Sequence, residues 1–91
     1  MKLDQIATKI VREQELIIGP IAWEEAGKVK GMHVVDKETI VIDDADERSV
    51  IDRLVNQYEH FFGRAAREVC KDAVSSLLAD LPQGDVPASL A

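Results

Sequence analysis

The chain has 91 residues and a formal net charge of -6, with 17 acidic residues against 11 Lys and Arg residues. This length predicts a single domain with a small core, and because aromatic residues are sparse that core must be mostly aliphatic. The negative charge disfavours nucleic acid and anionic membrane surfaces as partners, because Lys and Arg make most of the contacts to both.

Three further absences from the sequence concern its location. No apolar stretch approaches the length of a membrane-spanning helix, and the N-terminus lacks the apolar run of a signal peptide. The one cysteine, Cys70, has no partner for an internal disulfide. We therefore expect a cytoplasmic protein without a membrane segment.

Residues 2–18 are predicted to form a first helix. Its broad apolar face consists of Leu3, Ile6, Ile10, Val11, Ile17 and Ile18. Gly19 and Pro20 then interrupt the pattern, and two interpretations are open. Either Gly19 ends this helix and Pro20 begins a second one, or one helix is kinked by the proline.

The apolar face continues beyond this break through Ile21, Ala22 and Ala26. Trp23 is interpreted as a packing residue, with an interface anchor as the alternative, because tryptophan is enriched among hot spots of binding.

Residues 32–42 are predicted to form a β-hairpin, since two β-branched runs flank the residues 36–38. If side chains alternate between the faces, Met32, Val34, Ile40 and Ile42 point toward the helices. Val35 and Val41 then point outward. A two-stranded hairpin has unpaired outer edges, so pairing with the hairpin of a second copy is a further expectation.

Residues 44–81 show the most extended helical pattern in the chain. Apolar residues come in neighbouring pairs separated by three or four positions, which is typical of a helix with one apolar face. The spacing of Asp44 and Glu47 is that of a capping box. A cation site is the alternative, but the stretch lacks the glycine and spaced oxygen ligands of an EF-hand loop. Pro82 marks the end of the helix.

Gly63 divides this predicted helix into two halves. From Phe61 onward the apolar pairs repeat every four residues, so the stripe drifts by about 40° at each step. Either the helix breaks at Gly63, where glycine is unfavourable, or its second half is buried from two sides. An unbroken helix would be roughly 55 Å long, longer than a domain of this size covers. We therefore expect a homodimer, and a protein partner is also possible. The competing expectation is a monomeric helical hairpin bent at Gly63, in which Leu78 belongs to the core of the monomer. The expected interface residues are Phe61, Phe62, Ala66, Cys70, Val74, Leu77 and Leu78.

The chain divides into one small domain, residues 1–81, and a C-terminal tail, residues 82–91. Two prolines and a glycine predict that the tail has no regular secondary structure. Docking through Val86 and Leu90 is the alternative to disorder. The fold class is thus α+β and mostly helical: an N-terminal helix broken near Gly19 and Pro20, a short hairpin and a long C-terminal helix.

No catalytic, cofactor-binding or metal-ligating constellation is predicted. His33 and His60 have no second His or Cys at the spacing of a helical metal site. Cys70 lies in the apolar stripe and is expected to be buried and unreactive. Residues 27–31 lack the spacing of a phosphate-binding loop.

These patterns favour a non-catalytic protein-interaction or dimerisation module, a small adaptor or regulatory subunit acting through its long C-terminal helix. One alternative is a transcriptional regulator that binds DNA as a dimer, which would need a basic stripe on one folded face. Another is a small ligand-binding protein or enzyme with a site at a dimer interface. Tyr58, Glu59 or His60 would then lie at the mouth of that site.

Overall fold

The computed structural model describes residues 2–36, 39–43, 45–82, 84 and 86–90. Its elements in chain order are helices α1 (Lys2–Ile18) and α2 (Ile21–Gly27), strands β1 (Met32–Asp36) and β2 (Thr39–Ile42), helices α3 (Glu47–Phe62) and α4 (Arg64–Leu78), and the 3-10 helix η2 (Ala88–Leu90). This order confirms the predicted α+β, mostly helical fold class.

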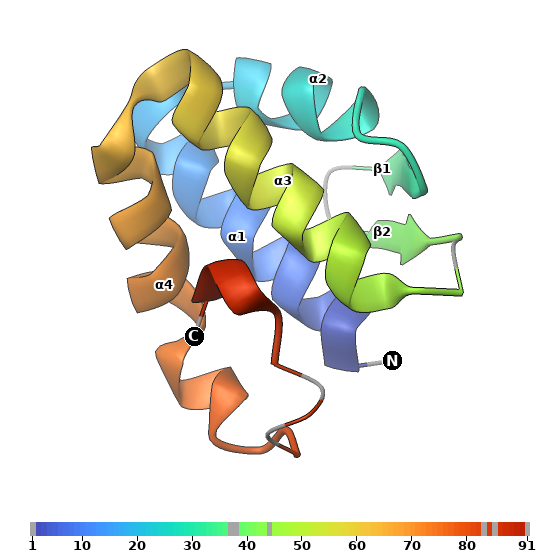
Figure 1. Ribbon diagram of the computed structural model, residues 1–91. Helices are drawn as coiled ribbons and strands as arrows, with labels where there is room; N and C mark the ends of the chain where they lie inside the picture. Colours follow the sequence, from blue (N-terminus) through green and yellow to red (C-terminus); the bar gives the residue numbers. More distant parts are fainter. Residues whose placement is uncertain (1, 37–38, 44, 83, 85, 91) are drawn as a thin grey trace.

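Helix α1 lies at the centre of the fold. It contacts α2, β2, α3 and α4, and Figure 1 shows it behind α3, with α4 on one side and the hairpin on the other. Residues three and four positions apart share a face of a helix. The face that begins at Leu3 and Ile6 accordingly continues through Ile10 and Val11 and is buried. It meets Val50, Ile51, Leu54, Val55 and Tyr58 of α3 in one aliphatic core.

The structure has two helices at Gly19 and Pro20, so the kinked-helix alternative is not the one found. Gly19 adopts a positive φ of 81°, and its N–H closes α1 by donating to the Glu15 carbonyl at 2.9 Å. Pro20 is the N-cap of α2. Trp23 is 7 % exposed within the core, which confirms its interpretation as a packing residue.

The hairpin has the predicted two faces. Its antiparallel register pairs Met32 with Ile42 and Val34 with Ile40, with an irregularity between Val34 and Asp36. Met32 and Ile40 are buried, and Val34 and Ile42 pack against the core. Val35 and Val41 are exposed as predicted. Of the expected connection at residues 36–38, Asp36 belongs to β1, and residues 37 and 38 lie outside the described part of the chain.

Gly63 breaks the C-terminal helical segment into α3 and α4. With φ 87° and ψ 179° it reverses the chain, and α4 packs back against α1 and α3. The molecule is consequently only 32 Å in its longest dimension, well short of the length of an unbroken helix. Of the two alternatives for Gly63, the break is the one found.

The start of α3 is capped by Asp46. Its carboxylate accepts hydrogen bonds from the Ser49 N–H at 3.4 Å and from the Ser49 hydroxyl at 2.7 Å. These bonds lower the pKa of Asp46. The cap is thus two residues beyond the predicted one, Asp44, which lies outside the described residues.

Part of the C-terminal tail is docked. Pro87, Ser89 and Leu90 are buried, and η2 packs on α3 and α4. In Figure 1 η2 (red) lies between α4 and the lower half of α3, with α1 behind it. Docking through Leu90, which is 3 % exposed, is therefore the alternative that the structure adopts.

Candidate functional site

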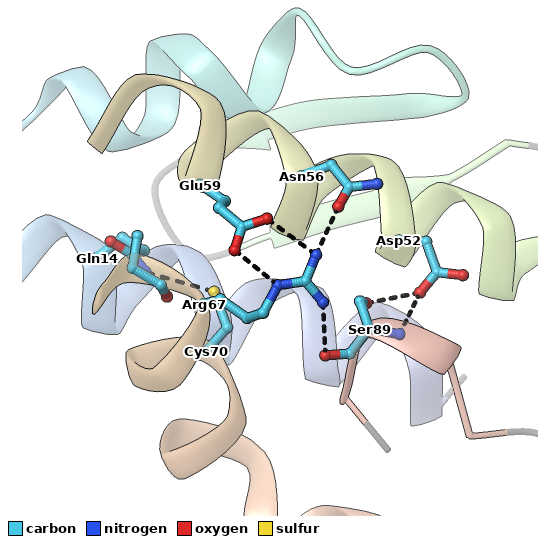
Figure 2. A network of polar contacts seen from close by, with 8 residues as sticks. Gln14, Asp52, Asn56, Glu59, Arg67, Cys70 and Ser89 are labelled. Carbon is cyan, nitrogen blue, oxygen red and sulfur yellow. Dashed lines mark hydrogen bonds and ion pairs between the residues drawn. The ribbon is translucent and has the colours of Figure 1, made fainter. Parts of the chain in front are cut away.

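A polar network centred on Arg67 of α4 joins three elements (Figure 2). Its guanidinium donates from Nε to Glu59 Oε2 at 2.9 Å and from Nη2 to Glu59 Oε1 at 3.1 Å. A further bond runs from Nη2 to Asn56 Oδ1 at 2.8 Å. Both acceptors lie on α3, which precedes the Gly63 turn, and Arg67 lies on α4, which follows it. Arg67 therefore fixes the two helices to each other across the turn. This ion pair lowers the pKa of Glu59 and raises that of Arg67.

The same network reaches the docked tail. Asp52 of α3 accepts from the Ser89 N–H at 3.0 Å and from the Ser89 hydroxyl at 2.6 Å. The Ser89 carbonyl accepts from Arg67 Nη1 at 3.4 Å. These contacts hold the chain together, so the network is a structural clamp on α3, α4 and η2.

A second polar contact crosses the core between α1 and α4. Gln14 is 1 % exposed, and its amide donates to the Ala66 carbonyl at 3.0 Å and to Cys70 Sγ at 3.3 Å. Burial raises the pKa of the Cys70 thiol to about 11. The thiolate is the nucleophilic form of cysteine, so at neutral pH this thiol is protonated, buried and suited to packing.

The residues considered for the mouth of an enzyme site lie in separate environments. Tyr58 is buried, donates its hydroxyl to the Ala22 carbonyl at 2.7 Å, and has its pKa raised by burial. Glu59 is bound to Arg67. His60 is exposed and lies edge-on to Phe61, with ring centroids 4.9 Å apart. The structure does not bring these three side chains together.

An apolar groove lies between α1 and α4. It has a volume of about 310 Å³ and is lined by Glu13, Leu16, Ile17, Val69, Asp72 and Ala73. We call it the α1–α4 groove. Leu16 and Ile17 are 80 % and 63 % exposed, so two adjacent large aliphatic side chains stand in water along one wall. Exposed apolar groups gathered in this way mark candidate interaction surfaces.

The residues expected at a dimer interface fall into two groups. Ala66, Cys70 and Val74 are buried within this chain, against α1 and α3. Phe62, Leu77 and Leu78 are partly buried against the core, and Phe61 is 57 % exposed. Only the second group remains at the surface where a partner can touch it.

Sequence reasoning missed Leu16 as a surface residue and placed Ile17 on the core face. A signal was present, because residues 16–18 are three consecutive large aliphatic residues. Successive residues of a helix are rotated by about 100°, so one core cannot cover all three. Gln14 is buried in the stripe and Ile18 is partly buried against the core, whereas Leu16 and Ile17 turn outward.

The described residues provide no arrangement of three or more His, Cys, Asp and Glu side chains that could hold a metal ion. His33 pairs with Asp43 at 3.4 Å on the exposed hairpin. None of the helices in the described ranges is long and apolar enough to span a bilayer.

A hollow larger than the α1–α4 groove lies between α1 and β2. It has a volume of about 530 Å³ and is lined by Thr8, Arg12 and Val41 among others.

Comparison of the chain with protein-family models, with curated proteins and with solved structures gave no significant match.

Proposed function

We propose that this protein is a non-catalytic interaction module that pairs with a second copy of itself through the α1–α4 groove. The observation that carries the proposal is the exposure of Leu16 and Ile17, 80 % and 63 %, beside Val69 and Ala73 of α4. The module thus acts through α4, which belongs to the C-terminal helical segment that the sequence pattern favours. Helix α1 forms the other wall of the groove.

We take a second copy as the occupant, because one surface carries both projecting aliphatic side chains and a groove beside them. Leu16 and Ile17 project from α1, while the groove beside them provides the space to receive such side chains. A two-fold interface brings the same patch of both subunits together. The projecting residues of each copy then enter the groove of the other.

Burial of these side chains favours pairing. A large aliphatic side chain gains about 1.5–3 kcal/mol on leaving water, and two-fold symmetry buries Leu16 and Ile17 twice. Association opposes this with a cost of about 4–15 kcal/mol. The expected dimer is therefore concentration-dependent, and sedimentation over a range of protein concentrations will show it.

The test compares the wild type with Leu16→Asp and with Val35→Asp. Both positions carry exposed aliphatic side chains, so neither substitution removes a core contact, but Val35 lies on the hairpin. The wild type is expected to approach twice the chain mass of 10.1 kDa as its concentration rises. Leu16→Asp should abolish this association, and Val35→Asp should leave it unchanged.

Two results would contradict the proposal. The first is a wild type that sediments as a monomer at every concentration. The second is a dimer that survives Leu16→Asp and is lost with Val35→Asp, which would place the contact on the hairpin instead. Circular dichroism of each variant checks that the helices are intact.

A further inference from the structure

A second groove, on a different face of the fold, has an unusual charge for this protein. It lies between the loop that follows α2 and the exposed side of α3. It has a volume of about 340 Å³ and is lined by Lys28, Val29, Lys30, Arg53, Asn56 and Gln57. We call it the α2–α3 groove. Its described lining contains three cationic and two amide side chains and no carboxylate, although the chain as a whole has a net charge of -6.

The fold gathers these side chains from two segments. Arg53, Asn56 and Gln57 are three and four residues apart and therefore share one face of α3. Val29 is 6 % exposed and anchors the loop in the core. Lys28 and Lys30 flank this anchor and are exposed. The loop is further fixed by the Val29 N–H, which donates to the Ala26 carbonyl at 3.1 Å.

Internal hydrogen bonds position the donors of the groove. Arg53 donates to the Lys30 carbonyl at 3.0 Å and so joins α3 to the loop. Glu25 accepts from Lys28 at 3.1 Å and from Gln57 at 2.9 Å. These bonds fix the positions of Lys28 and Arg53 at the edge of the groove. Glu25, which pairs with Lys28, and Asp46, which lies within the electrostatic influence of Arg53, offset part of the positive charge.

Asn56 is oriented by the Arg67 network. Arg67 has only donors, so the Asn56 carbonyl oxygen must face it, as the 2.8 Å contact shows. The amide nitrogen of Asn56 then points away from Arg67, as Figure 2 shows. The clamp therefore presents one further donor beside the three cations.

We propose that the α2–α3 groove binds the phosphate groups of a small phosphorylated ligand, with Lys28, Lys30 and Arg53 supplying positive charge and Asn56 a directed hydrogen bond. A cluster of cations suits a multiply charged anion better than a single carboxylate, and arginine matches the oxygen geometry of phosphate. The groove is open and exposed, so binding is expected to be weak and to depend on salt. This site is independent of the proposed dimer contact.

The test is a titration of the ¹⁵N-labelled wild-type protein with inorganic pyrophosphate at constant ionic strength, followed by amide NMR shifts. Saturable shifts are expected at residues 28–31 and 53–57. Lys30→Gln and Arg53→Gln should each weaken binding by about fivefold, the effect of one exposed charge contact of about 1 kcal/mol. Lys71→Gln, which removes the same charge from α4, is the matched control and should bind as the wild type does.

A titration with acetate tests whether the groove prefers phosphate groups to a carboxylate. It should produce no saturable shift at these residues, and inorganic phosphate should bind more weakly than pyrophosphate. The proposal is overturned if the pyrophosphate shifts are linear and spread over all cationic residues, or if Lys71→Gln weakens binding as much as Lys30→Gln. Equal binding of acetate and pyrophosphate would also overturn it. The NMR spectrum of each variant reports directly whether it is folded.

Discussion

Arg67 binds both carboxylate oxygens of Glu59, with Nε 2.9 Å from Oε2 and Nη2 3.1 Å from Oε1. The two residues are eight positions apart, and the turn at Gly63 lies between them. Paired contacts of this kind fix orientation as well as distance. The ion pair therefore sets the angle at which α4 leaves the turn and returns along α1.

This contact predicts a pH dependence of stability. Arg67 lowers the pKa of Glu59 in the folded state, so the carboxylate stabilises the fold above its ordinary pKa of about 4.3. That stabilisation is lost as the pH falls through the lower pKa of the folded state. In Glu59→Gln the free energy of unfolding should therefore decrease less steeply on acidification than in the wild type.

Urea denaturation at a series of pH values measures this slope. Glu68→Gln is the matched control, because Glu68 is an exposed carboxylate on α4. It should keep the wild-type slope. Parallel curves for the wild type and Glu59→Gln would contradict the role given to the ion pair.

Gly63→Ala is predicted to destabilise the fold by about 1–3 kcal/mol, the cost of placing a side chain in a backbone conformation that glycine tolerates. The cause is the backbone alone, since a Cβ at this position would meet no atom within 4 Å. Chemical denaturation measures the change. Gly27→Ala at the end of α2, which is equally open, should be neutral or stabilising by up to about 1 kcal/mol. A Gly63→Ala variant as stable as the wild type would show that the turn does not need glycine.

Cys70 is predicted to react slowly with a thiol reagent in the native protein. It is fully buried, and its pKa is raised to about 11, so both access and the thiolate form are limited. The labelling rate should rise toward that of a free thiol as denaturant opens the chain. Rapid labelling without denaturant would contradict the packing of α4 against α1.

Leu90→Ala is predicted to cost about 2 kcal/mol or more, as for other buried leucines, because η2 docks through this side chain. Ala88→Ser, at an exposed position of the same turn, should stay within about 0.5 kcal/mol of the wild type. Thermal or urea unfolding measures both. An unchanged stability of Leu90→Ala would mean that residues 86–90 contribute nothing to the fold.

Much of the fold could be predicted from local patterns. The helical period of residues 2–18, the break at Gly19 and Pro20, and the alternation along the hairpin each depend on neighbouring residues. They follow from the backbone conformations of glycine and proline and from the different periods at which side chains repeat along a helix and along a strand. The start of α3 shifted from Asp44 to Asp46, because both are acidic and either can cap a helix.

What covers an apolar face could not be predicted in the same way. The pattern through Ala66, Cys70 and Val74 correctly indicates a buried stripe, but amphipathicity does not say whether the covering surface comes from the same chain or from another. In this fold α1 covers it, because Gly63 turns α4 back. The exposure of Leu16 and the docking of Leu90 likewise depend on how distant segments meet.

The most direct test of the central claim is an isotope-filtered NMR experiment on a mixture of labelled and unlabelled protein, which detects only contacts between two copies. The proposed dimer predicts intermolecular signals between the methyl groups of Leu16 or Ile17 and those of Val69 or Ala73. The absence of all intermolecular signals at concentrations where the groove should be filled would contradict it. So would signals confined to Val35 and Val41 of the hairpin, or to Phe61 and Leu78.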